Sequence, residues 1–296
     1  MRRKSPASGH QARWWEQVTE GNFLINGLIN GLKEIIIDHI KFRRQLIKLA
    51  RTDVIKTYRG TAFGWAWAII KPAVTIFVFW FGFTFGIRSG RPINGYPFFY
   101  WMLAGFIPWF YMSNTLTAGA ESIRRYRYLV TRIKYPVDTI PTFVSMSQLF
   151  VNICLQLVMI LIFILYGDKP TIYYLELPFY NLLMFMFFTA WSLFSAMLSA
   201  MSQDFLNLVK AVTTALFWMS GIMYDVNSIE QDLLKRIMLF NPVTICVNGF
   251  RNVLIYHRWF WQTPDEMRKY FIVLGIMCVL AVWAYSKLKE DIPDVL

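Results

Sequence analysis

The feature that most constrains this chain is a series of six long apolar stretches separated by polar loops. Each is near or above the roughly 20 residues that an α-helix needs to cross a bilayer core of about 30 Å. A water-soluble domain of this size would rarely contain six, so we expect an all-α integral membrane protein with six transmembrane helices. The expected spans are Ala66–Ile87, Phe98–Gly119, Ile140–Tyr166, Pro178–Met201, Leu208–Tyr224 and Tyr270–Ser286.

The formal net charge of +12 has two possible explanations. A basic protein can bind nucleic acid, but most Lys and Arg residues here flank the expected spans, as in the inner loops of membrane proteins. We therefore expect membrane lipids as partners and no nucleic acid. The basic residues gather in 33–59 and 124–134, whereas the loop 167–177 holds only Lys169. This bias predicts a multi-pass membrane protein with both termini cytoplasmic.

The expected spans contain few ionisable residues and no paired carboxylates. The three histidines and three cysteines are scattered, so we predict no metal site. The sequence has neither a nucleophile elbow nor a phosphate-binding glycine loop. A proton- or sodium-coupled carrier usually buries ionisable groups near the midplane, but Asp53, Asp138, Asp204 and Asp225 lie near span ends. A pore-forming subunit that is driven by a separate partner remains, with no catalytic residue of its own.

Residues 39–61 are predicted to form an amphipathic helix on the membrane surface, between an N-terminal cytoplasmic segment (1–38) and the transmembrane domain (62–296). A plain membrane anchor and a contact element for a cytoplasmic partner both remain open for this helix. Its expected apolar stripe is Ile36, Ile40, Ile47, Ala50, Val54 and Tyr58. Its candidate functional residues are Lys41, Arg44, Lys48, Arg51, Asp53, Lys56 and Arg59.

The loop 121–135 after the second expected span is short, basic and rich in tyrosine. It is either a solvated charged loop or a short helix that docks against another protein, because Leu129, Val130 and Ile133 give it an apolar edge. Its candidate residues are Arg124, Arg125, Tyr126, Arg127, Tyr128, Leu129, Arg132 and Lys134.

Residues 226–256 are expected to form two short apolar-faced helices that are broken at Asn241-Pro242. Neither helix is long enough to cross a bilayer, so the pair should dip into the membrane from the outside or lie along it. A surface cap over the bundle and an outer gate are the two explanations for this hairpin.

Several motifs, in this order and spacing, resemble the ABC-2 type permeases of polysaccharide export, and among them most the permease subunits of wall teichoic acid transport. The likeness covers most of the chain from about residue 46 to 256. The motifs that carry it are 49–60, 63–67, Lys71-Pro72, 86–90, 97–99, 103–110, Tyr135-Pro136, 140–142, Asn241-Pro242 and 249–251.

The resemblance implies a permease that pairs with a second copy of itself and with two copies of an ABC ATP-binding subunit. ATP and Mg²⁺ would bind to that partner, and no cofactor to this chain. The implied function is the export of a lipid-linked polymer, a teichoic acid on polyprenyl diphosphate, from the inner to the outer face of the membrane. An O-antigen or capsular polysaccharide exporter and a membrane enzyme of glycolipid metabolism are the alternatives.

The resemblance also implies roles for the segments described above. Residues 124–134 would form the coupling helix, and the helix 41–59 would also contact the ATP-binding subunit. Asn241, Pro242 and Arg251 would belong to an outer re-entrant gate.

A charged polymer and a diphosphate cannot cross hydrocarbon unaided, so the cargo needs a lined path. Lys71 and Arg59 either attract the diphosphate at the inner mouth or extend their charges to the interface. The aromatic candidates either contact sugar or glycerol units or form an ordinary belt of rings at headgroup depth. The path candidates are Trp67, Lys71, Trp101, Trp109 and Phe110.

Overall fold

The computed structural model of the protein describes residues 26–87 and 92–296. This part of the chain is helical and contains no β-strand, which confirms the all-α prediction. Its only β-type pairing is a bridge between Ile93 and Tyr96. Residues 1–25 of the predicted cytoplasmic segment and residues 88–90 of the motif 86–90 lie outside the described residues.

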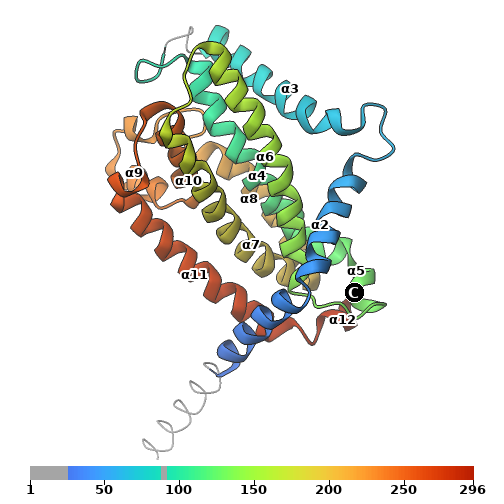
Figure 1. Ribbon diagram of the computed structural model, residues 1–296. Helices are drawn as coiled ribbons and strands as arrows, with labels where there is room; N and C mark the ends of the chain where they lie inside the picture. Colours follow the sequence, from blue (N-terminus) through green and yellow to red (C-terminus); the bar gives the residue numbers. More distant parts are fainter. Residues whose placement is uncertain (1–25, 88–91) are drawn as a thin grey trace, which may run out of the picture.

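Figure 1 shows the long helices as a bundle, with the helix α3 (Trp67–Phe81) leaning away from it. The first half contains a helix at residues 26–41, α2 (Arg43–Tyr58), α3 (Trp67–Phe81), α4 (Phe98–Arg125), α5 (Arg127–Thr131) and α6 (Thr139–Tyr166). The second half contains α7 (Leu177–Met201), α8 (Gln203–Met219), α9 (Asp232–Leu239), α10 (Pro242–Arg251), α11 (Pro264–Leu288) and α12 (Ile292–Val295). Short 3-10 or π turns are η1 (Gly64–Ala66), η2 (Gly82–Ile87), η3 (Ile172–Glu176), η4 (Val226–Ser228), η5 (Asn252–Tyr256) and η6 (Phe260–Gln262).

Four helical stretches of the described chain are long and apolar enough to cross a membrane: Gly64–Gly86, Thr139–Tyr166, Ile172–Met201 and Pro264–Leu288. They coincide with four predicted spans, and the chain is therefore a multi-pass membrane protein. The other two predicted spans fall on α4 and α8. α4 has 28 residues but carries polar residues at its middle, and α8 has only 17 residues. The count of six spans stays a prediction.

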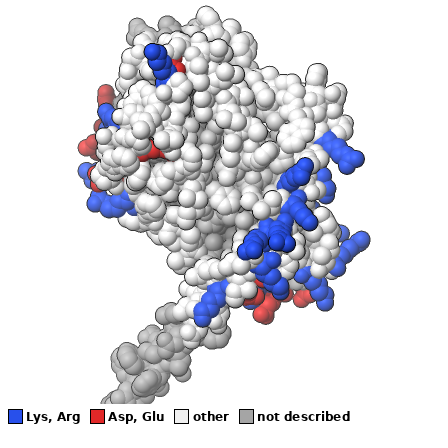
Figure 2. Space-filling model, viewed as in Figure 1, with Lys and Arg blue, Asp and Glu red and all other residues white. Residues whose placement is uncertain are grey.

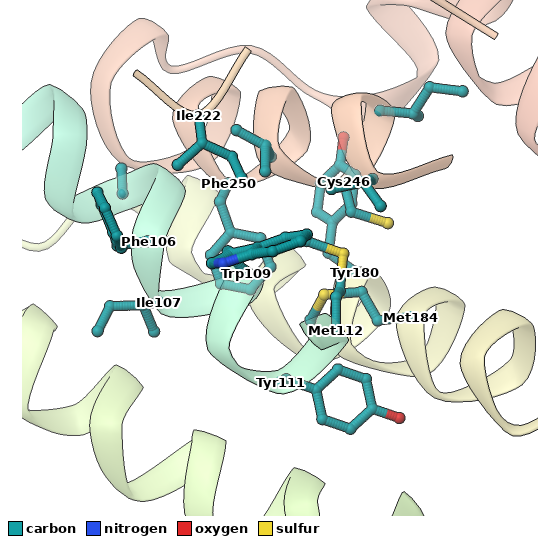
Figure 3. Packing of buried hydrophobic residues seen from close by; sticks show 14 of the residues in the cluster. Phe106, Ile107, Trp109, Tyr111, Met112, Tyr180, Met184, Ile222, Cys246 and Phe250 are labelled. Atoms are coloured by element: carbon teal, nitrogen blue, oxygen red, sulfur yellow. The ribbon is translucent and has the colours of Figure 1, made fainter. Parts of the chain in front are cut away.

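α4 forms the centre of the bundle, where it packs against α6, α7 and α10. Figure 3 shows Trp109 and Met112 of α4 among side chains from α7 and α10, including Tyr180 and Phe250. Burial of such large apolar side chains stabilises a helix bundle by about 1.5–3 kcal/mol each in water; in lipid, close packing replaces much of that term. Gly119 permits close approach of α4 and α7, because a Cβ at this position would collide with Ser192.

α3 packs loosely against the bundle, and Ile76 is its only buried residue. Its other large apolar side chains, such as Phe77 and Phe81, are exposed. Figure 2 shows a broad band across the molecule without Lys, Arg, Asp or Glu side chains. An uncharged band of this kind is the surface that a bilayer requires.

Candidate coupling site

Asp53 is the buried centre of the basic end of the molecule. It lies on α2, where Leu46, Ala50 and Val54 share its face and pack towards the bundle. Its carboxylate is 1% exposed and accepts hydrogen bonds from the hydroxyl groups of Tyr126 and Ser147. A buried carboxylate is costly unless it is paired and hydrogen-bonded, and here both conditions are met.

The partners of Asp53 come from two other segments, the end of α4 and the helix α6. Tyr126 joins α4 to α5, Ser147 lies on α6, and Arg125 is the last residue of α4. The guanidinium of Arg125 lies 3.2 Å from the Asp53 carboxylate and is 40% exposed. Burial, together with the hydrogen bond to the Asp53 carboxylate and its negative charge, raises the pKa of Tyr126. The phenol therefore stays protonated at neutral pH and donates to Asp53. One side chain thus connects α2, the loop 121–135 and α6.

The predicted amphipathic helix 39–61 differs from the structure in its bounds and its buried face. The chain turns at Phe42, so α2 begins at Arg43, and it ends at Tyr58. Ala50 and Val54 of the predicted apolar stripe are buried, but Ile36, Ile40 and Ile47 are exposed. The face of α2 that contains Asp53 lies against the bundle, where Asp53 accepts its hydrogen bonds. The spacing of apolar residues gave no indication of these bonds.

The basic residues of α2 remain on the surface. Figure 2 shows Lys and Arg side chains gathered over this helix and the neighbouring end of the bundle. The predicted residues that the structure leaves exposed here are Lys41, Arg44, Lys48, Arg51, Lys56 and Arg59.

The loop 121–135 contains the short helix α5, and its side chains divide into an inner and an outer set. Tyr126, Leu129 and Val130 are buried, so only Ile133 of the predicted apolar docking edge is exposed. Arg124 is half-buried and donates to the backbone carbonyls of Ser199 and Ala200 at the end of α7, the second at 3.1 Å. The predicted residues that face outward are Arg125, Arg127, Tyr128, Arg132 and Lys134.

His39 makes a second link at this end that the sequence did not reveal. Its Nε2 lies 2.8 Å from Thr142 Oγ1, and its Nδ1 lies 2.8 Å from the Ile35 carbonyl and 3.3 Å from the buried carboxylate of Asp138. Burial lowers the pKa of His39, but the hydrogen bonds to Asp138 and Ile35 and the negative charges of Asp138 and Asp38 outweigh it and raise the pKa. The His39 ring therefore links the helix 26–41 to the start of α6.

The opposite end of the bundle contains the predicted hairpin 226–256. The helix break at Asn241-Pro242 is confirmed, because α9 ends at Leu239 and α10 begins at Pro242. The Asn241 side chain accepts from the Val243 amide at 3.0 Å and donates to Ser220 at 2.8 Å. The re-entrant position of this hairpin in a membrane stays a prediction.

Arg251 is the most deeply buried cation among the described residues, with 2% of its surface exposed. Its Nη1 and Nη2 donate to the carbonyls of Gly221 and Ile222 at 2.8 and 2.7 Å, and its Cζ lies 3.2 Å from the ring centroid of Trp101. It therefore pins α10 to α4 and to the turn after α8. Gly105 makes room, because a Cβ there would lie 2.8 Å from Nη2.

The predicted path residues do not line one surface. Trp101 and Trp109 are 1% and 7% exposed, so both rings lie inside the bundle, and of the two only Trp101 borders a polar cavity, at the α10 end. Phe110 is half-buried against Phe106. Trp67 and Lys71 do lie together, with the ammonium 5.8 Å from the indole centroid, and both line a cavity of about 430 Å³ at the start of α3. In residues 26–87 and 92–296, no three His, Cys, Asp or Glu side chains come together as a metal site would require.

Residues 44–255 match the ABC-2 type transporter family, and the chain belongs to this family. The chain is 27% identical over 253 residues to the O-antigen export system permease protein RfbA of Myxococcus xanthus, covering 85% of this chain and 93% of that protein. It is 21% identical over 252 residues to the protein of the same name from Klebsiella pneumoniae, covering 85% of this chain and 94% of that protein.

Proposed function

We propose that this chain is the permease subunit of an ATP-driven exporter that moves a lipid-linked polysaccharide across the bacterial plasma membrane. Family membership supports the transport role. The names of both relatives describe O-antigen export, which favours the O-antigen alternative over a teichoic acid. A membrane enzyme of glycolipid metabolism has no support among the residues described.

The observation that carries this proposal is that a basic surface lies over the buried hydrogen bonds of Asp53. α2 and α5 present cations outward, while Asp53, Tyr126 and Ser147 fix them to α4 and α6 behind that surface. A force applied to α5 by a separate ATP-binding subunit would thus reach two long helices through buried hydrogen bonds. Rigid-body movement of packed helices is an established way to carry such a change.

The topology that we propose contains six spans, with α4 and α8 added to the four apolar stretches. α4 then crosses the membrane inside the bundle, where protein covers Thr115 and Ser122, although Asn114 is exposed on the single chain. The basic end with α2 and α5 faces the cytoplasm together with both termini, and the hairpin 226–256 enters from the outer side. Two copies of this chain work with two ATP-binding subunits, which hold ATP and Mg²⁺.

Charge reversal on the outward face of α5 tests this function. The variant Arg127→Glu/Arg132→Glu should co-purify with its ATP-binding subunit at least tenfold less, because about 1.4 kcal/mol of lost attraction is a factor of ten. Arg236→Glu, on exposed α9 at the other end of the bundle, is the matched control and should leave the complex intact. An undiminished double variant would remove α5 from the docking role.

The cargo is identified in cells that are depleted of this chain. Loss of a surface polysaccharide with intact teichoic acid is the expected result, and loss of teichoic acid alone would reverse the assignment. Turnover of a lipid substrate by the purified chain without an ATP-binding subunit would instead support the enzyme alternative.

A further inference from the structure

A polar cavity of about 370 Å³ lies at the α10 end of the bundle, away from α2 and α5. Its floor consists of the buried residues Trp101, Arg251 and Asn252. Exposed polar residues form its mouth, so the cavity communicates with the surface. The remaining lining residues are Asn94, Asp225, Asn227, Asn248, Tyr256, Arg258, Thr263 and Glu266.

The cavity wall is held in place by its own hydrogen bonds. Trp101 Nε1 donates to the Tyr256 hydroxyl at 3.1 Å. Asn94 lies in an Asn-Gly turn with a φ of 51°, and its amide donates to Tyr256 at 3.0 Å and to Asp225 at 3.2 Å. Arg251 is fixed from behind by two backbone carbonyls. A wall that is ordered in advance loses little conformational entropy when a ligand binds.

The charges of the lining cancel. Arg251 and Arg258 contribute two positive charges, and Asp225 and Glu266 contribute two negative charges. A phosphate or a metal cation would meet as much repulsion as attraction here, so the lining favours a neutral ligand.

The uncharged lining groups indicate the chemistry of that ligand. Four asparagine amides, a tyrosine and a threonine can each donate and accept hydrogen bonds. Neighbouring hydroxyl groups on a sugar ring also donate and accept, and they are neutral. Hydroxyl groups of this kind can therefore pair with several of the lining amides and hydroxyls at once.

We propose that this cavity binds a neutral sugar unit of the exported polysaccharide at the end of the permease opposite α5. That the sugar belongs to the exported polysaccharide rests on the proposed function. The cavity itself is formed by one copy of the chain. The site is therefore present whether or not the ATP-binding subunit is attached.

Fluorine NMR of the full chain in lipid nanodiscs tests this site. The tryptophans carry a 5-fluoro label, and Trp101→Phe identifies the resonance of Trp101. N-acetylglucosamine, glucose and their disaccharides should move this resonance in a saturable way with an affinity near the millimolar range. Inorganic phosphate, the anionic probe, should not move it.

Asn248→Leu removes one polar group from the wall at nearly constant size and should weaken the sugar affinity about tenfold. Asn207→Leu, on an exposed part of α8, is the matched control and should bind as the parent chain does. Unchanged elution of both variants on size-exclusion chromatography shows that they are folded.

Three results would contradict this proposal: no shift of the Trp101 resonance with any sugar, a shift with phosphate alone, or an unchanged sugar affinity in Asn248→Leu. Loss of sugar binding with an intact ATP-binding complex would leave the export function standing. If the chain binds sugar but no ATP-binding subunit co-purifies with it from its own cells, the proposed function is refuted and the cavity remains a sugar site.

Discussion

The hydroxyl group of Tyr126 donates a hydrogen bond to the carboxylate of Asp53, although the two residues are 73 positions apart in the chain. Both side chains are buried, beneath a surface that is rich in Lys and Arg. The pair joins the helix α2 to the segment that begins α5. The pair therefore links the two basic segments of the candidate coupling site.

Removal of the Tyr126 hydroxyl should weaken this link between α2 and the start of α5. Tyr126→Phe removes the hydroxyl donor from Oδ1 of the buried Asp53 carboxylate, which keeps the Arg125 guanidinium at 3.2 Å, and should cost about 1–3 kcal/mol of unfolding free energy. In the assembled exporter, we expect ATP hydrolysis to persist while polysaccharide export falls. A double-mutant cycle with Asp53→Asn should give a coupling energy of at least about 0.5 kcal/mol. Additive effects would show that the two groups do not act together.

A methyl group at Gly119 should destabilise the contact between α4 and α7. Gly119→Ala places a Cβ against Ser192, where the helices have no room, and overpacking of this kind costs about 1–3 kcal/mol. Gly275→Ala on α11 is the control, because a Cβ there meets no other atom within 4 Å. The control should be neutral or slightly stabilising in thermal unfolding, and equal losses in both variants would contradict the packing argument.

The stability of the protein should depend on pH through His39. Its pKa is raised in the folded protein by Asp138, the Ile35 carbonyl and Asp38, against the opposing effect of burial. This stabilisation is fully present below the unfolded pKa of about 6.5 and is lost as the pH rises through the raised folded pKa.

Thermal unfolding between about pH 5.5 and 8.5 measures the effect of His39. The melting temperature should fall with rising pH in the parent chain, and His39→Gln should remove part of that slope. His257→Asn, at an exposed histidine with a φ of 51° that asparagine tolerates, should keep the slope. A slope that His39→Gln leaves unchanged would assign the pH dependence to other groups.

The amides of Gln156 and Asn181 form a reciprocal pair between α6 and α7, with distances of 2.7 and 2.9 Å. Gln156→Leu should destabilise the protein by roughly 0.6–1.7 kcal/mol, the range found for hydrogen bonds between membrane helices. The double variant Gln156→Leu/Asn181→Leu should recover part of this loss, because it leaves no unpaired amide. Unfolding in detergent measures the free-energy loss of each variant. A loss in the double variant that equals the sum of the two single losses would contradict the pairing.

Much of the helical framework was predictable from the sequence. The apolar stretches 140–166 and 178–201 match α6 and α7 to within one residue, because helix length in a membrane follows directly from hydrophobic length. The break at Asn241-Pro242 was equally clear, since proline removes a helix hydrogen bond.

The candidate site was predicted less well, although its segments were correctly chosen. Asp53, Tyr126 and Arg125 all appeared among the candidate residues, but as members of two separate elements. Leu129 and Val130 were expected to face a partner and are buried instead. Trp101 and Trp109 were candidates either for cargo contact or for an aromatic belt, and both are buried, Trp101 at the floor of the polar cavity. Periodicity shows that a helix has an apolar face, but it does not show which neighbour covers that face.

The sequence by itself determined that this chain is helical, crosses a membrane and concentrates its cations near two segments, because these properties depend on local composition. Only the tertiary structure decided that Asp53 of one segment meets Tyr126 of the other and that Arg251 lies beneath Trp101. Such contacts join positions far apart in the chain, and burial makes them selective: a charge removed from water must find its partners wherever the packed helices bring them.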